Sequence, residues 1–509
     1  MEHILFIKDS FSIEGEPMGV MQLSAIAKMQ GFNTCLCSSK QDYKKLINKH
    51  KPAAIAISML SGEYTSIKTL IGEIKRYADK IPIIVGGPHP TFAPSALEDF
   101  GVEAICTGEG DRAFTEILKR IGAGTSFDGI PNIHTKTQKT PRGPLIENLD
   151  ELPFIDRELY YEASPVNRRF KMRSFYSSRG CPYGCTYCFN HAYNKLNKGL
   201  GRVVRKRSVE NLIEELEIVT KKYDTQYIRF SDDVFTHAAD DWLEKFSKEY
   251  KRKIGIPFYC LVRSNSVTKD MVTLLKNAGC NSVCMCIEAA NADLRRLILN
   301  RNLSNETIIK SFDLFNGSGI HTYSNSMLAL PTATLKDELD SLDLNIRCKP
   351  TCGLFSILLP YPGTEIHDYC IEHNLLDKDY NFEDISRSVG SYSMLSSFTD
   401  KEKKIQKNIV FLGPLVIKLP FLKKLFVKYL IYMPNNFIFL FIHYCTKYYL
   451  FKKYIIPMRY TLTDYLHFMI ATLKSEFKNM GVSNKDTIPP ERKYIIIPLY
   501  NPETDNTLP

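Results

Sequence analysis

The sequence lacks the features of secreted and membrane-spanning proteins. Its N-terminus, MEHILFIKDS, has no basic region followed by a long apolar segment and a cleavage site, so we expect a first strand there rather than a signal peptide. The most apolar stretch, residues 409–445, is interrupted by Pro414, Pro420, Pro434 and lysines. Because it contains no run of about 18 uncharged apolar residues, it is not expected to span a bilayer. We therefore expect a cytoplasmic protein.

Acidic residues are almost missing from one part of the chain. Residues 401–460 contain twelve Lys and Arg and one acid, Glu402, which gives a local charge of +11 against +10 for the whole chain. The remainder is close to neutral, so we expect no nucleic-acid partner. The 14 cysteines of this 509-residue chain are expected to be metal ligands or buried thiols, because disulfide frameworks belong to short secreted chains.

Strand and helix patterns divide the chain into four parts. Residues 1–135 alternate apolar runs with helical stretches and predict a doubly wound, Rossmann-like α/β domain of about five parallel strands. Residues 136–172 are predicted to be a linker with one or two short helices. Residues 173–385 predict an open (β/α)6 barrel of the TIM type, and residues 386–509 a helical C-terminal domain. The six barrel strands are expected near residues 174–179, 227–231, 257–262, 282–287, 321–329 and 353–359.

The most specific pattern is a group of three cysteines after the first barrel strand. Cys181, Cys185 and Cys188 stand in the sequence RGCPYGCTYCFN. Three thiolates can bind three irons of a 4Fe-4S cubane and leave the fourth iron open to an external ligand, which favours catalysis over electron transfer alone. The alternative is a zinc site, for which His191 would have to be the fourth ligand.

This spacing, at the exit of a strand in a six-unit barrel, resembles the radical S-adenosylmethionine (SAM) superfamily. Segments at the ends of later strands resemble the subgroup whose barrel follows a cobalamin-binding domain: residues 230–235, residues 260–263, Glu288, residues 330–331 and residues 360–364. In the N-terminal domain, residues 86–91 and 108–111 are similar to the cobalamin domain of that subgroup. The Asp-x-His-x-x-Gly signature is absent, so the cobalt is expected to lack a histidine ligand.

The resemblance implies three cofactors: a 4Fe-4S cluster, SAM and cobalamin. It implies Cys181, Cys185 and Cys188 as the ligands of the cluster, while no catalytic residue is assigned. The residues expected to bind SAM or cobalamin are Gly86, Gly87, His89, Glu109, Gly110, Asp232, Asp233, Arg263 and Glu288.

Each of these weaker signals also has a structural interpretation. Asp232 and Asp233 could be a solvated pair, Arg263 and Glu288 could form an ion pair, and His89 could be a structural histidine. The grouping of Cys280, Cys284 and Cys286 fits small core residues better than a second cluster. The basic, aromatic segment 401–460 could contact a membrane surface peripherally, or could cap the barrel with its lysines in water.

The resemblance implies a radical enzyme, and we expect a cobalamin-dependent methyltransferase acting at a poorly activated carbon. Hydrogen abstraction by a 5'-deoxyadenosyl radical would be followed by transfer of a methyl group from methylcobalamin. Two alternatives stay open: a non-methylating radical cyclase or rearrangement enzyme, and a cobalamin-binding sensor without turnover. We expect a small-molecule or lipid-like substrate and an electron donor such as a flavodoxin or ferredoxin.

Overall fold

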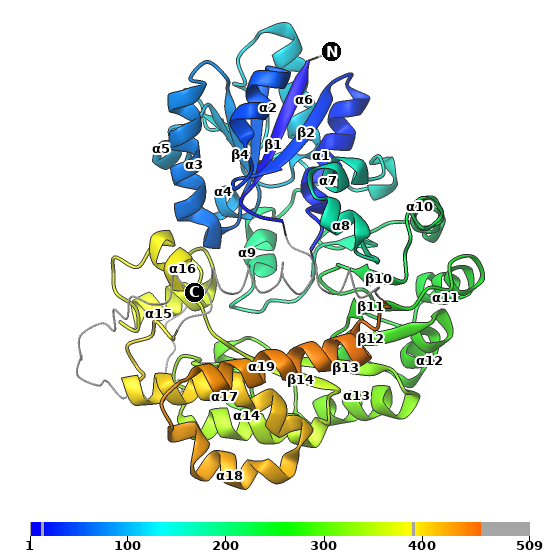
Figure 1. The fold of residues 1–509 in the computed structure, drawn as a ribbon, viewed down its shortest axis with the longest axis vertical. Helices are drawn as coiled ribbons and strands as arrows, with labels where there is room; N and C mark the ends of the chain where they lie inside the picture. The colour runs from blue at the N-terminus through cyan, green and yellow to red at the C-terminus, as the bar shows by residue number, and fades with distance from the viewer. Residues whose placement is uncertain (1, 12–14, 389–391, 460–509) are drawn as a thin grey trace.

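Two six-stranded sheets, one above the other along the long axis of the molecule, organise the chain (Figure 1). The structure is a computed structural model that describes residues 2–11, 15–388 and 392–459. The first sheet belongs to the N-terminal domain and the second to the barrel, and the C-terminal helices lie against the barrel (Figure 1).

The N-terminal sheet has the predicted doubly wound arrangement. Its parallel strands are β1 (His3–Lys8), β2 (Asn33–Ser38), β3 (Ala54–Ser58), β4 (Ile83–Gly86) and β5 (Ala104–Cys106), in the order β2-β1-β3-β4-β5. Ile4 and Phe6 belong to the core under α1 (Met18–Met29) and α6 (Gly110–Ala123). Leu5 and Ile7 belong to the core under α2 (Tyr43–His50), α3 (Tyr64–Tyr77) and α5 (Ala96–Phe100). Apolar side chains on both faces therefore bury the sheet between two helical layers.

A sixth strand, which the sequence analysis did not predict, closes one edge of this sheet. β6 (Ile133–Thr135) pairs antiparallel with β5. The predicted linker follows and contains two short helices, α7 (Arg157–Ala163) and α8 (Pro165–Arg169).

The barrel contains the six predicted parallel strands in sequential order. They are β7 (Met172–Phe175), β10 (Tyr227–Phe230), β11 (Phe258–Leu261), β12 (Cys280–Cys284), β13 (His321–Leu328) and β14 (Cys352–Ile357). β7 and β14 are the two edge strands, so the barrel is open. A short antiparallel pair, β8 (Ser178–Arg179) with β9 (Arg205–Lys206), was not predicted and extends from the exit of β7.

Five of the helices between these strands follow residues whose side chains cap them. The helices are α10 (Val209–Lys222), α11 (Asp241–Lys253), α12 (Lys269–Ala278), α13 (Asn305–Ser318) and α14 (Leu335–Cys348). Each capping side chain accepts a hydrogen bond from the backbone N–H three residues later, an interaction that contributes about 1 kcal/mol to a helix. The caps are Ser208, Asp240, Thr268, Ser304 and Thr334.

The C-terminal region is helical, as predicted, and covers the edge strand β14. Its helices are α16 (Phe382–Ser388), α17 (Asp400–Lys418), α18 (Lys423–Lys428) and α19 (Phe437–Leu450). Ile409, Leu412 and Val416 of α17 bury Phe355 of β14 in one core. No helix in the described ranges is long and apolar enough to cross a membrane. Residues 460–509, the remainder of the predicted C-terminal domain, lie outside the described residues.

Pro414 does not end a helix, although the sequence analysis treated it as an interruption. It lies inside α17, where a proline leaves the carbonyl four residues earlier without its helical donor. The ring of His443 in α19 lies 6.1 Å from that of Phe411. Burial lowers the pKa of His443 to about 4, and the backbone of Val410 and Phe411 acts in the opposite direction.

The chain from Phe451 to Ile455, labelled η7, packs on the inner face of the barrel. Phe451 and Ile455 share a core with inward-facing residues of the strands, among them Tyr259. Tyr227 and Ser282 each donate a side-chain hydrogen bond of 2.6 Å to the carbonyl oxygen of Ile455. The end of the described chain therefore completes the core of the barrel.

Candidate active site

The three predicted cluster cysteines lie together in the loop between β8 and α9 (Phe189–Leu196), at the carboxyl end of the first barrel strand. Cys181 and Cys185 are buried, and Cys188 is half-buried. The loop is fixed from both sides, because Asn194 donates a 2.8 Å hydrogen bond to the carbonyl of Cys181 and Asn300 a 2.7 Å bond to that of Gly184.

Hydrogen-bond donors point at the sulfur atoms of this loop. Burial raises the pKa of the Cys188 thiol to about 11 and also raises that of Cys181, while backbone N–H groups of Asn190 and Tyr183 act in the opposite direction. The guanidinium Nη1 of Arg263 lies 3.4 Å from the Sγ of Cys185. Such donors stabilise thiolates and tune iron-sulfur clusters, so the residues present fit the cluster.

The geometry differs from that of a single-ion site. The described residues contain no group of three or more His, Cys, Asp or Glu side chains that could hold a metal ion. In a cubane each cysteine binds a different iron, so the thiolates need not converge on one point. His191, which a zinc site would require, lies with its Nε2 3.0 Å from the Oε1 of Glu365.

The two adjacent aspartates have different surroundings. Asp232 is buried and accepts hydrogen bonds from the N–H and hydroxyl of Ser177, both 2.9 Å, and from the hydroxyl of Ser178. Burial raises its pKa to about 6. Asp233 is exposed and acts electrostatically on Cys181 and Cys188. A solvated pair is therefore the wrong interpretation for Asp232, which holds the chain that leads into the cysteine loop.

Arg263 and Glu288 do not pair with each other, contrary to their structural interpretation. The guanidinium of Arg263 stacks 3.8 Å above the ring of Tyr183 in the cysteine loop. Glu288 accepts a 2.8 Å hydrogen bond from Tyr187 and forms a 3.1 Å ion pair with Arg301. Both side chains thus contact residues around the cluster loop, and their contact with SAM stays a prediction.

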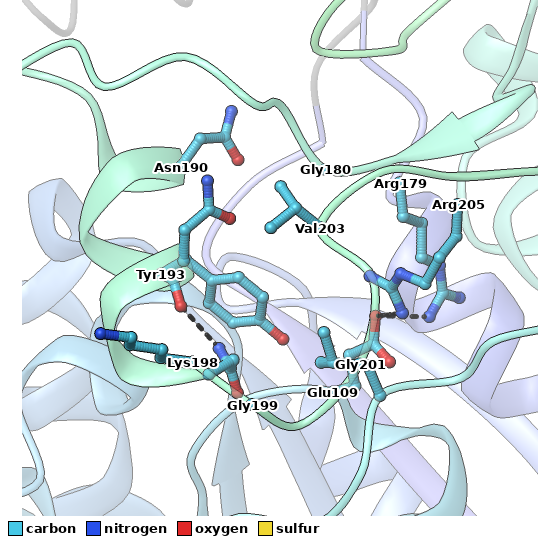
Figure 2. A pocket seen from close by; sticks show the side chains of 13 residues that line it. Glu109, Arg179, Gly180, Asn190, Tyr193, Lys198, Gly199, Gly201, Val203 and Arg205 are labelled. Atoms are coloured by element: carbon cyan, nitrogen blue, oxygen red, sulfur yellow. Dashed lines mark hydrogen bonds and ion pairs between the residues drawn. The ribbon is translucent and has the colours of Figure 1, made fainter.

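Glu109 lies where the two domains meet. Figure 2 shows its carboxylate facing Arg179 and Arg205 of the barrel domain, at 3.5 and 2.8 Å. Asp111, two residues later, accepts two hydrogen bonds from Arg179, of 2.8 and 3.0 Å. The guanidinium of Arg179 holds the pKa of the buried Asp111 below its usual range despite the opposing effect of burial.

A cavity of about 330 Å³ opens beside these charges. Gly180 and Val203 contribute to its wall on the barrel side, and Figure 2 shows Tyr193 of α9 along another side. It therefore lies between the N-terminal domain and the loop that carries the cysteines. The remaining lining residues are Glu109, Leu145, Arg179, Asn190, Asn194, Asn197, Lys198, Gly199, Gly201 and Arg205.

The other predicted cobalamin residues are placed by local packing. A Cβ atom at Gly87 would lie 2.9 Å from the carbonyl oxygen of Met59, which explains this glycine without a ligand. Gly86 ends β4 and Gly110 begins α6, so both lie at the carboxyl edge of the sheet, as expected. A ligand contact by these glycines stays a prediction.

His89 is fully buried among aromatic rings, including Tyr64 and Phe382. Its Nδ1 lies 3.2 Å from the hydroxyl of Ser61, and within the described residues its Nε2 has no hydrogen-bond partner. Burial lowers its pKa to about 4, so the ring is neutral at pH 7. These surroundings favour a structural role, and its contact with the corrin stays untested.

The carboxyl edges of the two sheets face each other. Phe92, which ends the short helix α4 (Pro88–Phe92) after β4, lies 4.5 Å from the ring of Phe189, the residue after Cys188. Phe189 in turn lies 5.3 Å from Tyr361, in the loop after β14. Parallel sheets bind ligands at this edge, so ligands of the two sheets would lie close to each other.

The charged partners that fix these groups were not predicted from the sequence. Arg179 and Asp111 each belong to a quoted motif, yet nothing in the sequence indicates that they pair across domains. Arg301 lies 13 residues after Glu288 and was not singled out.

Comparisons with known proteins agree with this geometry. The B12 binding domain family matches residues 4–118, and the Radical SAM superfamily matches residues 175–344. A relative from Pyrococcus horikoshii, named an uncharacterized methyltransferase, is 26% identical over 387 residues, which cover 73% of this chain and 82% of the relative.

Two solved structures share the fold. The radical SAM methyltransferase TsrM from Kitasatospora setae, solved with tryptophan and a SAM analogue, superposes with a TM-score of 0.61 at 17% identity and covers 73% of this chain and 76% of its own. The cobalamin-dependent SAM radical enzyme OxsB has a TM-score of 0.65 at 15% identity, over 94% of this chain and 76% of its own. The chain thus belongs to the cobalamin-dependent radical SAM enzymes, in which a B12-binding domain precedes a radical SAM core and the cofactors are a 4Fe-4S cluster, SAM and cobalamin.

Proposed function

We propose that this enzyme transfers a methyl group to a poorly activated carbon of a small molecule. The observation that carries the proposal is the contact between the two carboxyl edges, through Phe92, Phe189 and Tyr361. A methyl donor held by the first sheet and a radical source held by the second would reach the same substrate there. When bound, the cluster and SAM supply a 5'-deoxyadenosyl radical, and cobalamin supplies the methyl group.

The residues of the chain would bind and orient these groups. Cys181, Cys185 and Cys188 would hold the cluster, and the charge of Arg263 beside Cys185 would favour its reduced state. The aromatic contact of Phe92 with Phe189 would keep water away from the reacting atoms, because it closes the space beside the cysteine loop.

The ion pairs of the interface would set the distance between the two cofactors. Arg179 precedes the cysteine loop directly and binds Asp111, at the start of α6 in the other domain. Asp111 is buried, so this link is strong and directional. We propose that it is a positioning contact, and that an external flavodoxin or ferredoxin reduces the cluster.

The test is anaerobic turnover of the reconstituted enzyme with SAM, cobalamin and a reductant. Mass spectrometry should detect both 5'-deoxyadenosine and S-adenosylhomocysteine, since a methyl group has then left SAM. Both products should disappear in Cys185→Ala. The control Cys35→Ala changes a cysteine of the edge strand β2, far in sequence from the loop, and should retain both.

The products separate the alternatives. Formation of 5'-deoxyadenosine without S-adenosylhomocysteine would contradict methyl transfer and favour a cyclase or rearrangement enzyme. If neither product formed across a panel of candidate substrates, with the loading of cluster and cobalamin verified, a cobalamin-binding sensor would be the better interpretation.

A further inference from the structure

Large apolar side chains gather on the exposed surface of the C-terminal helices. Between Leu419 and Tyr449, eleven such residues are exposed, by 37 to 77% of their surface, whereas the rest of the described chain exposes only six. We call these eleven residues the C-terminal apolar surface: Leu419, Phe421, Leu425, Tyr429, Tyr432, Met433, Phe437, Ile438, Phe441, Tyr448 and Tyr449.

Helix α19 is apolar on two faces, of which the protein uses one. Phe439 and Leu450 are buried against the rest of the protein. Phe437, Phe441 and Tyr448 recur at intervals of four and seven residues, which places them on one stripe, and they are exposed by 62, 58 and 46%. Exposed apolar groups of this extent mark an interaction site.

Within this segment of the chain the charge has a single sign, although Asp343 of α14 lies 2.6 Å from the ammonium group of Lys423. No acidic residue occurs between Leu419 and Arg459, and six lysines do: Lys423, Lys424, Lys428, Lys447, Lys452 and Lys453. Several lie along aromatic rings, with the ammonium group of Lys428 5.0 Å from the ring of Tyr429 and that of Lys453 5.2 Å from Tyr449. The ammonium groups of these lysines thus lie close to the exposed aromatic rings.

This combination distinguishes between kinds of partner. Protein interfaces are depleted in lysine, whereas anionic lipid headgroups attract it. Tyrosine and phenylalanine beside lysine are typical of helices that lie in the interface of a bilayer. The charge of the surface is thus complementary to an anionic membrane.

We propose that the C-terminal apolar surface, with its lysines, binds peripherally to a bilayer that contains anionic phospholipids. α19 runs from this surface into η7, whose Phe451 lies 5.2 Å from Tyr323 on the inner face of the barrel. η7 thereby fixes the C-terminal end of α19, and with it the C-terminal apolar surface, to the core of the barrel.

Vesicle sedimentation of the full-length, cofactor-loaded protein tests the membrane contact without any turnover. We expect binding to vesicles of phosphatidylcholine and phosphatidylglycerol in equal parts, and little binding to phosphatidylcholine alone. The double change Lys424→Glu and Lys428→Glu should lower the partition coefficient by roughly 25-fold or more, since each lysine near the surface contributes a factor of roughly five. Its control is Lys248→Glu, an exposed lysine of α11.

The apolar contribution is tested separately. The double change Ile438→Ser and Phe441→Ser should lower binding by roughly tenfold or more, because two exposed side chains no longer enter the lipid. Ile218→Ser in α10 removes an apolar side chain of 49% exposure outside the surface and should leave binding unchanged.

Three results would overturn the inference. Equal binding to both kinds of vesicle would contradict the role of the lysines, and absence of binding to either would exclude the membrane. Self-association of the protein that Ile438→Ser and Phe441→Ser abolish, without vesicle binding, would identify a second copy of this chain as the occupant. None of these results depends on methyl transfer, so a failure of the membrane inference would leave the proposed function untested and is distinguishable from its failure.

Discussion

Gly180 is the position at which the cysteine loop should tolerate least change. Its φ angle is +92°, and a Cβ atom there would lie 1.9 Å from the carbonyl oxygen of Val203. An alanine with such a φ costs about 1–2 kcal/mol, and an overpacked contact adds about 1–3 kcal/mol. Gly180→Ala should therefore lower the free energy of unfolding of the barrel by about 2–5 kcal/mol.

A nearby glycine isolates the contribution of the contact. Gly199 has a φ of +81° and nothing within 4 Å of its Cβ position, so Gly199→Ala carries the backbone strain alone, about 1–2 kcal/mol. The difference between the two variants measures the collision with Val203.

The single tryptophan makes the assay specific for the barrel. Trp242 lies in α11, and the ammonium group of Lys206 in β9 lies 3.9 Å from its ring. Urea unfolding of the metal-free protein, followed by tryptophan fluorescence, should give the free energies of unfolding of both variants. In a separate measurement, the iron content after reconstitution should fall in Gly180→Ala. Equal stability of the two variants would refute the described approach of the cysteine loop to Val203.

Three further predictions concern charged groups. Asp111→Asn leaves Arg179 without its buried partner and should destabilise the protein by about 3 kcal/mol in urea unfolding, whereas Glu116→Gln, which breaks an exposed pair with Lys119, should cost less than about 0.5 kcal/mol. Burial raises the pKa of Glu338 to about 7, above its unfolded value near 4.3, so its contribution to stability is full below about pH 4.3 and is lost as the pH rises through 7. Glu338→Gln should remove up to about 3 kcal/mol of this pH dependence, measured as unfolding free energy at several pH values, and an unchanged profile would exclude Glu338 as its source. Arg263→Gln removes a positive charge 3.4 Å from Cys185 and should lower the cluster potential by roughly 50–100 mV in an electron paramagnetic resonance titration, whereas an unchanged potential would place Arg263 away from the cluster.

The strands and helices could be predicted because their patterns are local. Barrel strands such as β11 are apolar runs buried on both faces, and helices such as α10 begin after a capping side chain, here Ser208. The three cysteines were equally visible, because their spacing lies within one loop. The order of the strands then follows, since sequential βα units pack side by side.

The missing parts depend on contacts between distant residues. β6 and the pair of β8 with β9 are two or three residues long, too short to give a periodic signal. The environment of Asp232 could not be predicted, because its partners are distant in the sequence. Ser177 and Ser178 precede it by 55 and 54 residues, and an aspartate in a loop gives no sign of such contacts. For the same reason, the alternative in which Arg263 forms an ion pair with Glu288 was wrong.

The packing of η7 inside the barrel has a consequence for synthesis of the chain. The last barrel strand ends at Ile357, but the inner face receives its partner only when Ile455 has been made, 98 residues later. At ribosomal rates of about 5–20 residues per second, the strands wait roughly 5–20 seconds with their inner apolar residues uncovered. Folding of the barrel is therefore completed only after Ile455 has been made, and a chaperone that shields that face during the interval should increase the yield of native enzyme.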